Sequence, residues 1–272
     1  MGTQMMNLKS IIIIFLVAAG LIFTASNKLE ADAGNHVSRE PVSERKQVHG
    51  AMPCEACKKF DDLNTAIRDG RIDKTEAMAR LKVILAELAE FAGESGLPAK
   101  SFSRCVFPLA GYDASAIGGD KGSGYVEGGY DYFDGNAHTG HPAHDLFIRD
   151  RNRDNLDDVT GKAVPVLAMD GGIVVAVETK WKKGSPLRGG RYIWIYNPAA
   201  VSLTYYAHNE AIFVGLGDVV NPGDKIATAG RTGLNADRKR SATHLHLMHL
   251  KIMEGLPHTQ DRFGVFSTCQ FR

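Results

Sequence analysis

The sequence lacks a strong excess of either charge. Its 272 residues include 32 Lys and Arg and 31 Asp and Glu, which gives a formal net charge of +1. The longest cationic groups, such as Lys182-Lys183 and Arg238-Lys239-Arg240, are too short to form a binding stripe and fit solvated loops. A nearly neutral chain has no long-range attraction for the nucleic-acid backbone. We therefore expect no nucleic-acid partner.

Long apolar runs are scarce as well, and the clearest one lies near the N-terminus. It extends from Ile11 to Phe23, follows Lys9, and no acidic residue precedes Glu30. The run is short for a membrane span, which needs about 20 residues. A positive start, an apolar centre and small residues after it are typical of a secretory signal. We expect residues 1–26 to be a signal peptide or an uncleaved signal-anchor, the latter giving inner-membrane association. Either way the body is expected outside the cytoplasm, in the periplasm, the cell envelope or the extracellular space.

Cysteine is rare, and its number fits that compartment. The four cysteines are Cys54, Cys57, Cys105 and Cys269. An even set in an exported protein predicts two disulfides, and three pairings are open. An alternative is that Cys54 and Cys57 form a redox-active CxxC, but the βαβ context of such motifs is missing. A structural zinc at the four cysteines is disfavoured because a second CxxC is absent.

The chain divides into a helical part and a β-rich part. Residues 27–50 are polar and have no periodic pattern, which predicts a linker. Residues 51–105 are expected to form a helical segment that contains the CxxC. Within it Asp73 can cap a second helix. The apolar positions at helical spacing are Phe60, Leu63 and Ile67 in the first helix and Met78, Leu81, Ile84, Leu85, Leu88 and Phe91 in the second, which Gly93 and Gly96 would end.

Residues 106–272 have short apolar runs between Gly, Asp and Pro turns. This spacing predicts a mainly β fold, an antiparallel sheet of barrel-like form, with the helices as a small N-terminal segment. Tyrosines in the Gly-rich stretch 106–140 could line a groove or pack beside turns. The expected strands are Val164–Met169, Gly172–Thr179, Tyr192–Tyr196, Val201–Tyr206, Ile226–Ala229 and His244–Ile252.

Histidines supply the candidate chemistry. His244 and His246 alternate in a strand pattern, so they point to the same face. If the segment around residue 144 is extended, His141 and Asp145 also share a face, and His144 points to the other face as a surface residue. Two histidines and a carboxylate match the ligand count of a catalytic zinc site.

Another histidine, His208, follows a predicted strand, where it can reach the rim of the sheet. His138 and His249 lie near these motifs in the sequence. We expect them to be loop or outer-face residues rather than ligands.

The order of these motifs resembles the lysostaphin/LytM-type zinc endopeptidases, which cut peptidoglycan cross-links and have a duplicated hybrid motif fold. The resemblance covers roughly residues 106–252. The matching elements are HxxxD at His141 and Asp145, YxH at Tyr206 and His208, turns at Gly217-Asp218 and Pro222-Gly223-Asp224, Gly230-Arg231-Thr232-Gly233, and His244-Leu245-His246.

The resemblance implies one zinc per chain, held by His141, Asp145 and His246. It implies that His208 and His244 are the catalytic histidines, with zinc-bound water as the nucleophile and peptidoglycan peptides as substrates. Which of the two deprotonates water and which stabilises the oxyanion stays open. The family usually has Gly at the position of Ala143 and a small apolar residue at that of His144.

An acidic insertion follows the first motif. Asp150, Asn152, Asp154 and Asp158 stand at positions 1, 3, 5 and 9 of a calcium-loop pattern, but position 12 is Gly161 rather than Glu. A solvated loop is therefore the expected state of Asp150–Asp158, with bound calcium as the alternative.

Two other functions compete with an active peptidase. Relatives that only regulate another wall hydrolase typically lose ligands, whereas this chain keeps all five site residues. A biotinyl- or lipoyl-carrier hybrid barrel would need a modified Lys in a hairpin turn, which the sequence does not offer. We also hypothesise that residues 27–105 inhibit or target the catalytic domain at 106–272.

Overall fold

The computed structural model describes residues 53–95, 97, 105–122 and 124–272. The predicted leader 1–26 and linker 27–50 lie outside the described residues. Within the described part, no helix combines the length and the apolar character that a membrane crossing requires.

Two long helices form near the N-terminal end of the described chain, as predicted. Helix α1 spans Glu55–Arg68 and α2 spans Lys74–Glu94. The Asp73 carboxylate accepts hydrogen bonds from the amides of Thr75 and Glu76, which satisfies two donors that α2 leaves free at its start. Helix α2 ends at Glu94 with Ser95 as its C-cap, between the two glycines that were expected to end it. Shorter helical turns are η1 (Ala114–Ala116), η2 (Asp120–Gly122), η3 (Tyr132–Ala137) and α3 (Phe263–Phe266).

The remainder is antiparallel β-structure, which confirms the predicted fold class. All six expected strands form, and each of their ends lies within two residues of the expected position. The strands are β1 (Ala143–Phe147), β2 (Pro165–Leu167), β3 (Gly172–Glu178), β4 (Tyr192–Asn197), β5 (Ser202–Ala207), β6 (Ala211–Ile212), β7 (Val219–Val220), β8 (Lys225–Thr228), β9 (His244–Met253) and β10 (Leu256–Thr259).

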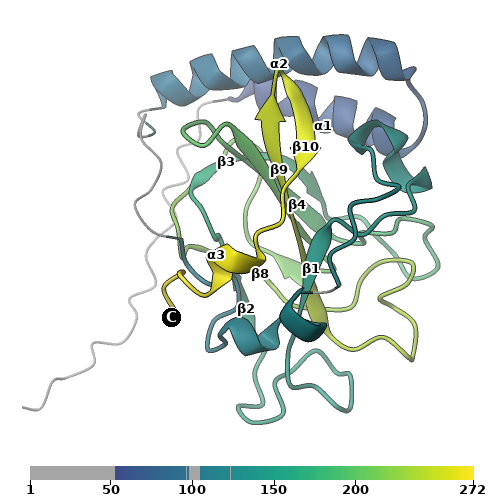
Figure 1. The fold of residues 1–272 in the computed structure, drawn as a ribbon, viewed down its shortest axis with the longest axis vertical. Coiled ribbons are helices and arrows are strands. Elements are labelled where there is room, and N and C mark those ends of the chain that lie inside the picture. Colours follow the sequence, from purple (N-terminus) through teal and green to yellow (C-terminus); the bar gives the residue numbers. More distant parts are fainter. Residues whose placement is uncertain (1–52, 96, 98–104, 123) are drawn as a thin grey trace, which may run out of the picture. The chain divides into compact units, whose positions relative to one another are not determined.

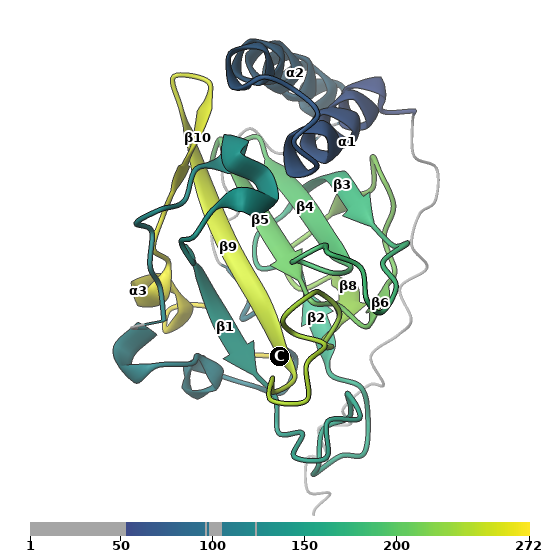
Figure 2. The ribbon, with the colours of Figure 1, turned by 90° about the vertical axis from the view of Figure 1, so that its right-hand side faces the viewer.

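The strands make a large sheet and a small one. The large sheet has the order β1-β9-β5-β4-β3-β7, with β10 paired to β9, and the small sheet has the order β2-β8-β6. Figure 2 shows β1, β9, β5 and β4 side by side, with α1 and α2 at the top of the view. Strand β9 has β5 on one side and β1 followed by β10 on the other, so it is hydrogen-bonded along its length.

Each face of the large sheet has its own apolar core, because side chains alternate along the strands. One face packs with α1 and α2, through residues such as Phe60, Leu88 and Trp194. The other face packs with the small sheet and α3, through residues such as Leu247 and Phe266. The side of β9 that carries His244, His246 and Met248 is the side that faces the helices.

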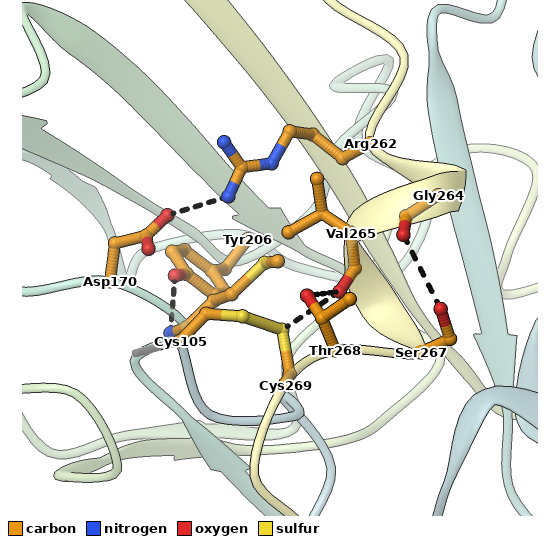
Figure 3. Close-up of a disulfide and its surroundings, with 10 residues drawn as sticks. Cys105, Asp170, Tyr206, Arg262, Gly264, Val265, Ser267, Thr268 and Cys269 are labelled. Atoms are coloured by element: carbon orange, nitrogen blue, oxygen red, sulfur yellow. Dashed lines mark hydrogen bonds and ion pairs between the residues drawn. A yellow bond between two sulfur atoms is a disulfide. The ribbon is translucent and has the colours of Figure 1, made fainter. Parts of the chain in front are cut away.

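Two disulfides are present, as predicted, and the structure shows which of the three possible pairings forms. Cys54 bonds Cys57 at the start of α1, and Cys105 bonds Cys269 across 164 residues of sequence. Figure 3 shows the Cys105–Cys269 bond beside the buried ring of Tyr206, whose hydroxyl accepts a hydrogen bond from the Met169 amide. This bond therefore ties the start of the β-rich region to the C-terminal tail.

Removal of the long-range disulfide should lower stability more than removal of the local one. A cross-link restricts the unfolded chain more when it closes a longer loop. We expect the Cys105→Ser/Cys269→Ser pair to lose about 2–4 kcal/mol in free energy of unfolding, measured by urea denaturation. The Cys54→Ser/Cys57→Ser pair is the matched control and should lose less. Equal losses in the two pairs would contradict this account.

Candidate metal centre

Strand register brings the two motifs together. In the β1–β9 ladder Asp145 lies opposite His246 and Phe147 lies opposite His244. On the other side of β9, His246 lies opposite Ala207, the residue before His208. The helix-facing side of three adjacent strands, β1, β9 and β5, therefore collects the carboxylate and the histidines at one end of the sheet.

Three of these side chains converge on one point. Asp145 Oδ1 lies 2.9 Å from His246 Nδ1 and 3.4 Å from His141 Nε2. One ligand atom from each residue falls within 4.8 Å of the others, and among the described residues this is the one such group of His, Cys, Asp or Glu. Ligands about 2.0–2.2 Å from a tetrahedral zinc lie roughly 3.4 Å apart. Two imidazole nitrogens and a carboxylate at these separations fit zinc.

The carboxylate of Asp145 is ionised. Burial favours its neutral form, but hydrogen bonds from His141 and His246 outweigh burial and hold its pKa well below the usual range. The hydrogen bond between His141 and Asp145, opposed by burial, raises the pKa of His141. Burial lowers the pKa of His246. Since metal binding requires a neutral imidazole, a fixed negative charge here favours a cation in place of protons.

Backbone carbonyls fix the tautomers of three histidines. The Nδ1 atoms lie 2.9 Å from the Gly124 oxygen for His141, 2.7 Å from the Thr232 oxygen for His208, and 2.8 Å from the Ala242 oxygen for His244. A carbonyl only accepts, so each Nδ1 carries the proton and donates it. In the neutral ring Nε2 then keeps its lone pair. His141 can thus ligate through Nε2, and His208 and His244 can accept protons there.

His208 occupies an unusual backbone conformation beside the pair. Its φ is 65°, in the left-handed region, and its amide donates to the Gly189 oxygen at 2.9 Å. The ring centroid lies 4.8 Å from that of His244 and 5.4 Å from that of His246. Burial, and then the charges that His244 and His246 would carry, lower the pKa of His208 well below its ordinary value. The imidazole of His208 is therefore neutral.

A cavity of about 330 Å³ opens beside these residues. His141, Asp145, His208, His244 and His246 all line it. For the stretch 106–140, lining a groove was one of two expectations for its tyrosines, and Tyr130 and Tyr132 do line the cavity. The rest of the wall was not predicted as part of the site. It includes Asn64, Ile67 and Arg68 from α1, the aromatic residues Tyr130, Tyr132, Tyr192, Trp194 and Tyr205, and Arg188.

The expectation that His144 is a surface residue was wrong. Its side chain is 3% exposed, with Nε2 2.9 Å from Asp261 Oδ1 and the ring stacked on Tyr125. As expected, it lies on the face of β1 opposite to Asp145 and packs near Phe266. Its partner is more than 100 residues away in sequence, and local spacing carries no signal of that contact.

The other flanking histidines stay outside the ligand group. His249 is buried, with Nδ1 3.0 Å from Thr204 Oγ1. His138 lies in a loop and lines the cavity, with Nδ1 3.1 Å from the Gly140 oxygen. Tyr206 of the YxH motif points away from the cavity into the opposite core, whereas its neighbour Tyr205 faces the site. Strand alternation at Tyr205 could have identified that residue.

The acidic insertion is organised by its own backbone. The Asp150 carboxylate accepts hydrogen bonds from the amides of Arg153, Asp154 and Asn155 and from the Thr243 hydroxyl. Thr243 directly precedes His244, so the insertion is tied to the start of β9. These contacts account for the burial of Asp150 without a cation, and calcium binding at Asp150–Asp158 stays the untested alternative to the expected solvated loop.

Several solved structures are similar to this chain. Lysostaphin from Staphylococcus simulans matches with 22% identity and a TM-score of 0.36, over 59% of this chain and 53% of its own. A zinc containing peptidase from Vibrio cholerae matches with 24% identity and a TM-score of 0.38, over 58% and 39%. A putative glycyl-glycine endopeptidase lytM from Ruminococcus gnavus matches with 17% identity and a TM-score of 0.42, over 78% and 83%.

The chain spans about half the length of that lysostaphin chain. No curated protein sequence matches it. A family model, Peptidase family M23, matches residues 155–255, a segment that contains His208, His244 and His246 and begins after His141 and Asp145. This match confirms the resemblance to the lysostaphin/LytM-type peptidases over that segment.

Proposed function

We propose that this chain is an exported zinc-dependent metalloendopeptidase that hydrolyses peptide bonds in peptidoglycan cross-links. The observation that carries the proposal is the convergence of His141, Asp145 and His246 beside two further histidines with free Nε2 lone pairs. The M23 match supports a peptidase, and the family resemblance supports peptidoglycan as the substrate.

In this proposal His141 Nε2, Asp145 Oδ1 and His246 Nδ1 hold the zinc. When bound, zinc would supply Lewis acidity, which lowers the pKa of water toward ~7 and polarises a carbonyl. Three protein ligands leave room for water and substrate. The cavity beside them provides the space for a peptide.

His208 and His244 handle the protons of the reaction. Attack of a water oxygen on the scissile carbonyl carbon releases a proton, which one of the two Nε2 atoms accepts. When the C–N bond breaks, the proton passes to the leaving nitrogen. A histidine that has become protonated can also donate a hydrogen bond to the oxyanion. The carbonyls of Thr232 and Ala242 keep both rings oriented for these steps.

The proposed ligand set predicts a sharp difference between two histidines on opposite faces. His246→Ala should bind well under one zinc per chain, because two ligands remain. His144→Ala is the control, since His144 is adjacent to Asp145 but lies on the other face. It should keep one zinc per chain, measured by mass spectrometry of metals after gel filtration. Far-UV circular dichroism checks that each variant is folded. Full zinc content in His246→Ala would disprove the assignment.

The proton-transfer roles predict variants that keep zinc and lose rate. His208→Ala and His244→Ala should each retain one zinc per chain, while the release of new amine termini from purified peptidoglycan falls about 10²–10⁴-fold. A chelator should abolish the cleavage of peptidoglycan by the zinc-loaded protein, and added zinc should restore that cleavage.

If either variant keeps the activity of the wild type, that histidine has no role in the mechanism. A zinc-loaded wild type without turnover that activates a separate wall hydrolase would instead indicate the regulatory function.

A further inference from the structure

The cavity beside the proposed zinc site carries a positive charge that the mechanism does not use. The charged side chains in its wall, apart from the histidines, are Arg68, Asp145 and Arg188. Asp145 faces the histidines. Arg68 is balanced by carboxylates, since Nε lies 2.7 Å from Asp69 Oδ1 and Nη1 lies 3.0 Å from Glu178 Oε2. Arg188 is the remaining cation.

Arg188 is anchored through one edge of its guanidinium. Nη1 donates to the carbonyl oxygens of His138, at 2.5 Å, and Asn136, at 3.4 Å. Within the described part of the chain no carboxylate forms an ion pair with it. A guanidinium has five N–H donors, and the backbone contacts occupy only those on Nη1. Arg188 therefore has donors on Nε and Nη2 for an acceptor that enters the cavity.

Backbone contacts hold Arg188 next to a catalytic histidine. The following residue, Gly189, accepts a hydrogen bond from the His208 amide. A Cβ atom at Gly233 would lie 2.3 Å from the Arg188 carbonyl oxygen and 2.9 Å from His208 Nδ1, so the approach of these segments requires glycine there. The charge of Arg188 also lies near His138 and Tyr205. It disfavours the protonated form of His138 and favours the ionised form of Tyr205, so it acts to lower the pKa of each.

We propose that Arg188 binds a carboxylate of the substrate close to the scissile bond. The proposal rests on the peptidase function above and specifies its substrate class as an acidic peptide. A guanidinium recognises a carboxylate through paired, charge-assisted hydrogen bonds, and a partly enclosed cavity screens that attraction less than open water does. A stem-peptide cross-link carries free carboxylates, whereas a glycine bridge offers none within the bridge. The structure thus favours direct stem-peptide cross-links over glycine bridges as substrates.

The test uses matched ligands that differ only in that charge. Single stem peptides with free carboxylates, and the same peptides with carboxamides, are titrated into zinc-loaded protein by calorimetry. Cross-linked dimers of both forms are assayed for kcat/KM. Wild type should bind and cleave the acidic form about 10–100-fold better. Arg188→Gln should abolish that preference through KM, with kcat little changed, and Arg188→Lys should keep part of it.

Arg191→Gln is the control. Arg191 is three residues away, also donates to a backbone carbonyl, that of Glu210, and does not line the cavity. It should keep the full preference for the acidic peptide. Wild type that binds both forms equally, or Arg188→Gln that keeps the preference, would overturn the proposal. Equal weakening of both forms in Arg188→Gln would assign Arg188 a purely structural role.

The two proposals can fail separately. If wild type binds the acidic stem peptide selectively but cleaves neither dimer, the peptidase function fails and the carboxylate site stands. If wild type cleaves both dimers with equal kcat/KM and binds both stem peptides equally, the function stands and the carboxylate site fails.

Discussion

The site depends on one cross-strand pair. Asp145 on β1 lies directly opposite His246 on β9, and their side chains meet at 2.9 Å. Because side chains alternate along a strand, a one-residue slip of β1 against β9 would turn Asp145 away and bring His144 to the cavity. The apolar residues of β1 and β9 prevent this slip. Leu146 and Leu247 are buried in the core opposite to the helices, so the correct register is also the one that buries them.

Charge and burial act together around that pair. An ionised Asp145 in a half-buried position needs compensation, and the protein supplies it with histidines. The rings are in turn held by carbonyls from separate loops, those of Gly124, Thr232 and Ala242. Sheet geometry places the carboxylate and His246, whereas loop backbone decides which nitrogen of the other rings faces the cavity. Both are required before the site can hold a metal and move a proton.

The sequence predicted the parts of the molecule that depend on local spacing. Alternation placed His244 and His246 on one face, the four-residue spacing joined His141 to Asp145, and Asp73 marked the start of α2. It did not reveal the contacts that join distant segments. The burial of His144 depends on Asp261, and the pairing of Cys105 with Cys269 depends on the whole fold. The same holds for α1 and Arg188 in the cavity wall, since no motif marks a residue that reaches a site through tertiary packing.

Helix α1 has a direct relation to the site that its position in the sequence does not suggest. Asn64 donates to the Tyr192 hydroxyl and accepts from that of Tyr132, which joins α1, β4 and η3 in a buried network along the cavity. The helical segment lies outside the part of the chain that matches the M23 family. An inhibitory or targeting role for residues 27–105 stays a prediction, and the structure adds that α1 contributes side chains to the cavity itself.

The most direct measurement of the central claim is anomalous X-ray scattering at the zinc absorption edge from crystals of the zinc-loaded protein. The account predicts one anomalous peak per chain, about 2.0–2.2 Å from His141 Nε2, Asp145 Oδ1 and His246 Nδ1, with the Nε2 atoms of His208 and His244 not coordinated. A peak coordinated by His208 or His244 in place of one of these three residues, or no peak beside Asp145, would contradict it.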